Sequence, residues 1–231
     1  SQSDGSLTAA WKSALDRAAR LGFSQVLLGL PEDTLSPQAE QQQAIEQLVS
    51  AAKRLRLQVW LDVSIGELPA TSPLAVAHPE WYRSALADRP LDPRLAPALR
   101  NLVDVQIVNG RVPAACLECW ADMLGAWTAA GVTGLRFHLP HRLPADDWRT
   151  LFARLSQGAP GVRLAAWTPG VPADRVGSLR DAGFNAAFTS LAWWDFRAGW
   201  FAAERDRLAG LGQLIAFPRS PFDESVSPGA D

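Results

Sequence analysis

The segment GLRFHLPH (134–141) places three chemically capable side chains close together: Arg136, His138 and His141. An apolar run that follows a helical pattern and ends on a polar residue before proline is typical of a parallel strand that delivers one side chain to the carboxyl edge of a sheet. A histidine there could act as a general base, because imidazole changes charge near neutral pH. No carboxylate or cysteine lies near it in the sequence to orient the ring. The pattern therefore favours a packed, uncharged His138 over a catalytic one.

Cys116 and Cys119, in the segment CLEC, could suggest a metal or redox site. A structural zinc site needs about four ligands, and the chain has three histidines and no second cysteine pair. The two cysteines also lie in a segment of helical periodicity, where a disulfide between positions i and i+3 would be strained. We therefore expect no metal, no cofactor and no disulfide.

Flat aromatic side chains are a third candidate group. Trp193 and Trp194 could stack on sugar rings, and Trp167 or Trp193 could cover the mouth of a strand-end pocket. The chain has ten tryptophans, however, and most aromatic residues in a helix-covered sheet pack in the core. Sugar stacking is therefore the alternative to core packing at these positions.

The composition limits the class of protein. Lysine and arginine number 22 against 24 aspartates and glutamates among 231 residues, and no basic stripe is present, so a nucleic-acid partner is not expected. No apolar run approaches the roughly 20 residues of a membrane span. We expect a soluble, cytoplasmic protein. Because the chain starts without Met and ends in a loop-like ESVSPGAD, we also expect it to be a piece of a longer protein.

Six helix-like segments alternate with six short apolar runs, which predicts an α/β fold with a parallel sheet. No GxGxxG or GxxxxGK[ST] follows any of the runs, which favours a (β/α) TIM-barrel-like fold over an open nucleotide-binding sheet. Six units make that barrel incomplete or distorted. The expected strands, neighbours in this order, are Val26–Leu30, Val59–Val63, Leu135–His138, Leu164–Trp167, Ala186–Thr189 and Leu214–Phe217.

One domain is expected over residues 1–231, interrupted by a long segment, 66–113, after the second strand. This segment is rich in proline and contains the strand-like NLVDVQIVNG. Long insertions in compact domains are usually functional or form a small subdomain.

Three stretches resemble the α-amylase superfamily of glycoside hydrolases, and more narrowly its bacterial α-1,4-glucan:maltose-1-phosphate maltosyltransferases. These are LDVSIGELPATSPLAVAHPEWYR, GVTGLRFHLPHRLPADDWRTLF and LAAWTPGVPADRVGSLRDAGFNAAFTSLAWWD. His78 to Tyr82 match the HPEWF/Y signature of that group. Arg136, Pro140 and His141 follow the frame of its nucleophile strand, FRVDNPH. The resemblance covers roughly residues 11 to 223.

The resemblance also exposes departures. The nucleophilic aspartate of the family falls on His138, and the acid glutamate of its LAEAFTRP strand falls on Ala165. Asp223 is a possible remnant of a third family carboxylate. A retaining glycosidase needs two carboxyl groups about 5 to 5.5 Å apart, so the resemblance implies a catalytically degenerate site. It further implies a structural role for Asp62. Because no aspartate stands beside Arg136, we expect this arginine to pair with Asp62 or another strand-end acid.

Three hypotheses follow. The first is a degenerate accessory module with a structural, docking or α-glucan-binding role, whose candidate binding residues are Asp62, Arg136, His141, Trp167, Trp193 and Trp194. Its expected partners are an α-glucan or malto-oligosaccharide and the rest of its own polypeptide or a second copy. The second is an active α-glucan hydrolase or transglycosylase that uses Asp62, Asp195 and Asp223; two carboxyl groups within about 6 Å across an open pocket would favour it. The third is an unrelated barrel enzyme with His138 as general base, which a carboxylate bonded to His138 would favour.

Overall fold

The computed structural model describes residues 4–29, 39–85 and 101–217. Its main sheet has six parallel strands in the order β1-β2-β6-β7-β8-β9. Their bounds are β1 (Gln25–Gly29), β2 (Gln58–Val63), β6 (Gly134–Phe137), β7 (Arg163–Trp167), β8 (Ala186–Phe188) and β9 (Gln213–Ile215). The predicted strands and their order are confirmed, because spatial order follows chain order without a switch point. Only their ends differ: His138, Thr189 and Phe217 lie beyond the strands, and Leu30 lies outside the described residues.

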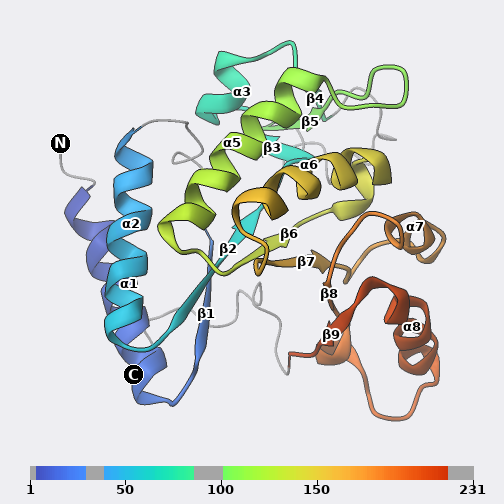
Figure 1. Ribbon diagram of the computed structural model, residues 1–231. Helices are drawn as coiled ribbons and strands as arrows, with labels where there is room; N and C mark the ends of the chain where they lie inside the picture. Colours follow the sequence, from blue (N-terminus) through green and yellow to red (C-terminus); the bar gives the residue numbers. More distant parts are fainter. Residues whose placement is uncertain (1–3, 30–38, 86–100, 218–231) are drawn as a thin grey trace.

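Helices precede the strands and lie around the sheet in chain order (Figure 1). They are α1 (Asp4–Arg20), α2 (Ala39–Arg54), α5 (Ala114–Ala130), α6 (Ala145–Gly158), α7 (Ala173–Val176) and α8 (Trp200–Leu208), with one-turn 3-10 helices η3 (Gly177–Leu179) and η5 (Ala209–Leu211) after the last two. Helix α5 ends at Gly131, whose φ of 109° is a left-handed conformation that suits glycine. None of the described helices is long and apolar enough to cross a membrane.

The two faces of the sheet carry different clusters, because successive side chains of a strand point to opposite faces. Leu61, Phe137 and Ala166 belong to the large core that includes the helix side chains. Trp60 and Trp167, one position away from Leu61 and Ala166, belong to a separate aromatic cluster on the other face. In the described ranges no strand pairs with the outer edge of β1 or β9. The sheet is therefore an incomplete (β/α) barrel with an aromatic interior.

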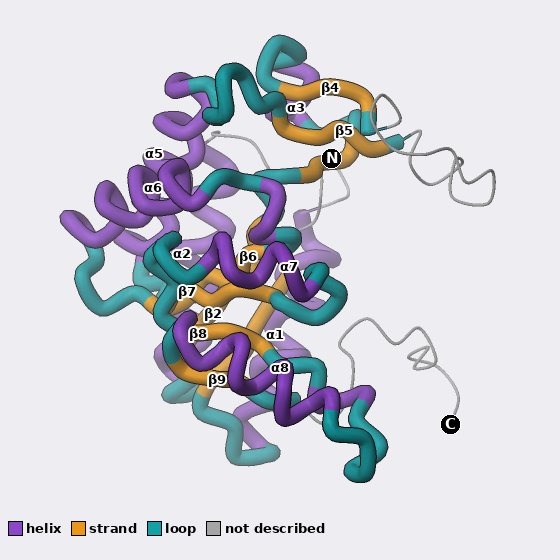
Figure 2. The backbone as a smooth tube through the Cα atoms, turned by 90° about the vertical axis from the view of Figure 1, so that its right-hand side faces the viewer, coloured by secondary structure: helices purple, strands orange, loops and turns teal. Residues whose placement is uncertain are grey.

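The segment 66–113 contributes a second sheet, which is antiparallel and has the order β3-β5-β4. Its elements are β3 (Glu67–Pro69), helix α3 (Pro73–Ala77), β4 (Tyr82–Ser84) and β5 (Leu102–Val105). It lies at one end of the molecule, near the start of α5 (Figures 1 and 2). The hydroxyl oxygen of Tyr82 accepts a hydrogen bond of 3.1 Å from Trp120 Nε1, which joins β4 to α5.

The HPEWY segment forms the turn that leads from α3 into β4. The His78 ring stacks on the Trp81 ring with centroids 3.6 Å apart and an interplanar angle of 7°. His78 Nδ1 lies 3.1 Å from a carboxylate oxygen of Glu80. The signature residues therefore stabilise one another locally.

The contact between Trp60 and Gly134 gives a test of the fold. The two residues are opposite each other in neighbouring strands, and a Cβ on Gly134 would lie 2.4 Å from two atoms of the Trp60 ring. Gly134→Ala should therefore lower the free energy of unfolding by about 1 to 3 kcal/mol, measured by denaturant unfolding.

Gly125→Ala is the matched control. Gly125 lies inside α5, and nothing lies within 4 Å of the added Cβ, so alanine should raise stability by up to about 1 kcal/mol. Equal stability of Gly134→Ala and the unmodified chain would contradict the packing of Trp60 over Gly134.

Candidate functional site

Three polar side chains meet on the inner face of the sheet, at the carboxyl ends of β2 and β6. Asp62 and Arg136 are opposite each other in the register of these strands. The backbone N–H of His138 donates to the carbonyl of Val63 at 2.8 Å, so the ladder continues one residue past β6. Strand alternation then puts His138 on the same face as Arg136.

Asp62 is the centre of this group. Arg136 donates to it through two nitrogens: Nε lies 2.5 Å from Oδ1 and Nη2 lies 2.6 Å from Oδ2. His138 Nε2 lies 3.1 Å from Oδ1. Two parallel bonds between a planar guanidinium and a carboxylate form the strongest kind of ion pair in proteins.

Two expectations about these residues can now be compared with the geometry. The expected ion pair between Asp62 and Arg136 is present. The expectation that His138 lacks an acidic partner is wrong, because Asp62 bonds to it. Sequence proximity could not reveal that partner, since it lies on the neighbouring strand of the sheet; only the β2–β6 register brings the two together.

The environment of Asp62 favours its ionised form. Burial is the largest single influence and raises the pKa of the carboxyl, but hydrogen bonds from His138 and Arg136 and the attraction of their charges outweigh it. The pKa of Asp62 therefore lies below its ordinary value.

Aromatic rings fill the space beside this network. The guanidinium carbon of Arg136 lies 4.6 Å from the centroid of the Trp167 ring and 5.1 Å from that of Phe188. The rings of His138 and Trp167 are 5.9 Å apart, and Phe217 stacks on Trp167 at 5.1 Å. Arg136 is consequently only 3% exposed, and its charge is balanced by Asp62 and by the ring faces.

Ala165 lies opposite Arg136 in the register of β6 and β7 and is fully buried in the same aromatic cluster as Trp167 and Phe188. A longer side chain at this position would have to displace the rings or the guanidinium. At the position that aligns with the acid glutamate of the family, neighbouring side chains thus fill the space that a longer side chain would need.

The other predicted site residues are placed differently. His141 lies in the 3-10 helix η2 (Pro140–Arg142), and its buried Nδ1 has no hydrogen-bond partner in the part of the chain that the structure describes. Burial and the charges of Arg142 and Arg175 lower the pKa of His141.

Trp193 and Trp194 lie at the 3-10 helix η4 (Leu191–Trp193) after β8 and point to different partners. Trp193 is 53% exposed and meets Phe217 edge-on, whereas Trp194 donates from Nε1 to the Ala198 carbonyl at 2.7 Å. Asp195 is exposed, and its Oδ1 accepts from the backbone N–H groups of Arg197 and Ala198, which lower its pKa. Asp223 lies outside the described residues.

A second carboxylate pair, which the sequence reasoning missed, joins the small sheet to the barrel. Glu67 and Asp104 are opposite each other in β3 and β5, and both contact Nη1 of Arg142, Glu67 at 2.9 Å. Their carboxylates share one guanidinium, and neither residue lines the two grooves of about 660 and 520 Å³ described below. The sequence signal for this pair was Asp104 in the strand-like LVDV. Like charges directly opposite each other on paired strands are destabilising, so an acid opposite Asp104 indicates that a cation lies nearby.

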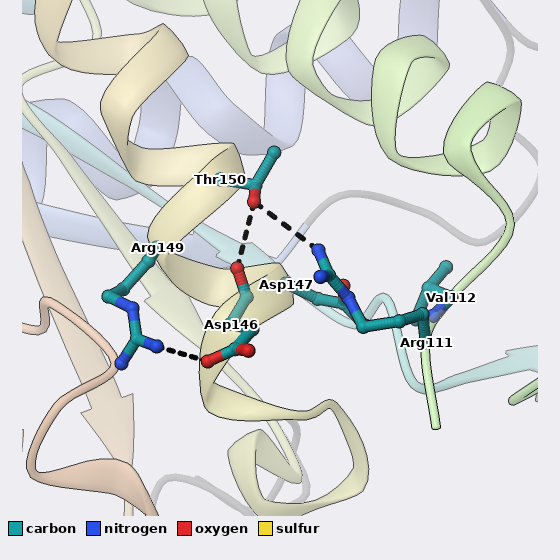
Figure 3. Close-up of polar contacts among 6 residues, drawn as sticks. All are labelled: Arg111, Val112, Asp146, Asp147, Arg149 and Thr150. Atoms are coloured by element: carbon teal, nitrogen blue, oxygen red, sulfur yellow. Dashed lines mark hydrogen bonds and ion pairs between the residues drawn. The ribbon is translucent and has the colours of Figure 1, made fainter. Parts of the chain in front are cut away.

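Asp147, a buried acid at the start of α6, was also not identified from the sequence. Asp147 is fully buried; its Oδ2 accepts from the backbone N–H of Val112 at 2.8 Å, and Arg111 bonds to its Oδ1. Thr150 Oγ1 donates to the Asp146 carbonyl at 2.9 Å (Figure 3). These contacts fix the chain that enters α5 against α6, which is a structural role.

Two surface grooves lie away from the Asp62 network. One of about 660 Å³ is lined by α1 and α2, and one of about 520 Å³ by α5, α6 and the residues before α5. Neither is lined by Asp62, Arg136 or His138. Over residues 4–29, 39–85 and 101–217, no cluster of three histidine, cysteine or acidic side chains is arranged to hold a metal ion.

The network predicts an acid-sensitive contribution to stability. Asp62→Asn leaves the buried Arg136 charge without its counter-ion and should lower the free energy of unfolding by about 2 to 4 kcal/mol at pH 7. Because the folded pKa of Asp62 is depressed, its contribution is present above the unfolded value of about 4 and is lost as the pH falls through the folded value. Denaturant unfolding should be followed from about pH 7 to about pH 2, a range that spans this titration. Acid should lower the free energy of unfolding less in Asp62→Asn than in the unmodified chain.

Asp122→Asn provides the control, because Asp122 forms an exposed pair with Arg154 at 3.1 Å. Its effect should stay below about 0.5 kcal/mol. If Asp62→Asn behaved in the same way as Asp122→Asn, the network would not stabilise the fold.

Comparisons with known proteins agree with this architecture, although no family model matches the chain. The alpha-1,4-glucan:maltose-1-phosphate maltosyltransferase of Burkholderia pseudomallei is 30% identical over 228 residues, which cover 90% of this chain and 20% of that protein. The protein of the same name from Corynebacterium glutamicum is 26% identical over 193 residues, 82% of this chain and 28% of that protein. The chain thus spans a fifth to little more than a quarter of these relatives.

Solved structures show the same fold. The crystal structure of an α-amylase from Lactobacillus plantarum has a TM-score of 0.61 at 18% identity, covering 84% of this chain and 51% of that one. A maltogenic α-amylase from Thermotoga neapolitana has a TM-score of 0.58 at 16% identity, covering 84% of this chain and 47% of that one. At such identities the likeness concerns the fold alone. Taken with the maltosyltransferase matches, it shows that this chain is related to the α-amylase superfamily.

Proposed function

We propose that this chain is a catalytically silent α-amylase-type barrel that serves as an accessory module of a maltosyltransferase-like protein in α-glucan metabolism. The observation that carries the proposal is the Asp62–Arg136–His138 network, which occupies the strand ends where the resemblance places the catalytic carboxylates. Here the nucleophile position holds a histidine bonded to Asp62. The acid position holds the buried Ala165.

The chemistry of retaining glycosidases supports the proposal that this chain is catalytically silent. One carboxylate must attack the sugar, and a second carboxyl group must protonate the leaving oxygen from about 5 to 5.5 Å away. Asp62 is engaged on both oxygens by Arg136, so it is not offered to a substrate. Glu67 and Asp104 are both ion-paired with Arg142. Asp195 is held by its own loop.

The edges of the sheet support an accessory role. Strand β1 carries the apolar run Val26 to Leu28, and its pairing in the described residues is with β2 alone. Open edges of this kind are normally covered by another element or by a partner. We propose that further parts of the same polypeptide cover them, because the related maltosyltransferases are several times longer than this chain.

One observation favours a second function. A histidine bonded to a carboxylate is the arrangement of a general base, and His138 Nε2 lies 3.1 Å from Asp62. Arg136 binds the same carboxylate and Trp167 lies next to the imidazole, which favours a structural network over this alternative.

The proposal predicts that the purified chain is inactive. Incubation with maltose 1-phosphate and malto-oligosaccharides should release no phosphate and lengthen no glucan, and incubation with α-1,4-glucans should release no reducing sugar. Loss of a catalytic carboxylate typically costs several powers of ten in rate, and here neither is in place. Turnover that persists after repurification, and that Glu67→Gln or Asp104→Asn abolishes in folded protein, would overturn the proposal.

His138→Ala separates the structural reading from the general-base reading. The variant loses ring packing and leaves Asp62 with one partner fewer, so the free energy of unfolding should fall by about 1 to 3 kcal/mol, while any glucan affinity stays unchanged. Thermal unfolding and glucan titration on the same preparation measure both. Unchanged stability together with lost affinity or lost turnover would identify His138 as a site residue.

A further inference from the structure

The larger of the two surface grooves, of about 660 Å³, runs between the first two helices. Helices α1 and α2 lie side by side at the edge of the sheet that ends in β1 (Figure 1). The apolar part of the lining comes from both helices: Trp11, Leu15, Leu48, Ala51 and Leu55. We refer to this feature as the α1–α2 groove.

Helix α1 uses little of its surface to cover the core. From Trp11 to Arg20, Leu15 alone is buried, whereas α5 buries seven side chains. Trp11 is only partly buried where it packs against the core. In the turn that follows α1, Leu21 is 64% exposed and Phe23 60%. Tryptophan is enriched among the anchors of protein interfaces, so this incomplete packing indicates a surface that a protein partner covers.

The charged side chains that line the groove alternate in sign. On α1, Lys12 lies about one turn before Asp16, and on α2, Glu46 lies about two turns before Arg54. Among the described residues none of these four side chains forms an ion pair. The four charges sum to zero, so the groove favours neither a strongly acidic nor a strongly basic partner.

A second copy of the chain matches this order of charges. The two helices run in the same direction, because they lead into β1 and β2, which are parallel neighbours. Consider a copy placed face to face, about a two-fold axis that lies in the interface and is perpendicular to the helices. Each helix then meets its own counterpart in antiparallel orientation, as an isologous contact requires. Lys12 of each copy faces Asp16 of the other, and Glu46 faces Arg54.

Helix α1 is the central element of such a contact. In the described residues α1 packs on α2 and β1, whereas α2 lies between α1 and α5. Lys12 and Asp16 are therefore on the helix that has the fewer neighbours within the chain. An apolar centre with Trp11 and Leu15 and a charged border is also the usual anatomy of a protein interface.

From these observations we propose that the α1–α2 groove is a homodimer interface, in which the α1 helices of two copies pack antiparallel about a two-fold axis. The interface goes beyond the proposed accessory role and lies on the helices. It therefore leaves the Asp62 network and the outer edges of β1 and β9 free for other contacts.

Sedimentation velocity of the 231-residue chain, from about 1 to about 100 μM, tests this inference. We expect a reversible equilibrium between monomer and dimer. Lys12→Glu and Asp16→Lys should each weaken the dimer at least about tenfold, because like charges then face each other across the two-fold axis. An equimolar mixture of the two variants should recover the dimer, since the introduced glutamate of one variant then faces the introduced lysine of the other. An effect of either substitution on folding alone would give no such recovery.

Lys53→Glu is the matched control, because it makes the same change of charge on α2 outside the groove. Lys53 is exposed, and its Nζ would lie 3.0 Å from a Cβ on Gly131, which places it on the side of α2 that faces the end of α5. The variant should dimerise as the unmodified chain does. Circular dichroism and denaturant unfolding establish that each variant is folded.

Three results would overturn the inference. A folded chain that stays monomeric at about 100 μM would leave another protein segment as the occupant of the groove. Dimers that survive both single charge reversals would place the contact elsewhere. A mixture of Lys12→Glu and Asp16→Lys that stays monomeric would exclude the antiparallel pairing of α1. The proposed catalytic silence is decided by the transfer assay and does not depend on these results.

Discussion

The bond between Asp62 and Arg136 is the constraint on which the interior of the sheet depends. A guanidinium stays charged at any physiological pH, so a nearly inaccessible Arg136 requires a carboxylate at bonding distance. The β2–β6 register supplies Asp62 directly opposite. A slip of one residue would turn Asp62 toward the helices and leave the charge unpaired, so the ion pair also specifies the register.

The difference between local signals and contacts that depend on register explains which parts of the fold and site could be predicted from sequence. The parallel strands and their order were predictable, because each is an apolar run next to a helical period, and these signals are local. The small sheet was only partly visible, since β3 and β4 have three residues each. Contacts such as His138–Asp62 and Arg142–Glu67 depend on register between distant segments, which no local pattern encodes. Trp193 and Trp194 are adjacent in the sequence, which does not show that Trp193 is 53% exposed whereas Trp194 packs against Phe196 and Phe201.

The chemistry that the site can perform depends on how completely the side chains on the inner face of the sheet contact one another. Small side chains at Gly134 and Ala165 leave room for the Trp60 ring and for the Arg136 guanidinium. Trp167 and Phe188 then cover that charge. A catalytic strand end needs the opposite arrangement, with a carboxylate that is held by a few bonds and faces a space for substrate. Here the corresponding volume is occupied by side chains that bond to one another.

Ion pair and aromatic packing also stabilise each other, which bears on how the site could change. The rings exclude water from Arg136 and thereby strengthen its attraction to Asp62, while the ion pair holds the guanidinium where the rings can stack on it. Introducing a single glutamate at Ala165 would add a second buried carboxylate and break the ring packing at once, so the two catalytic groups could not be restored one at a time without loss of stability.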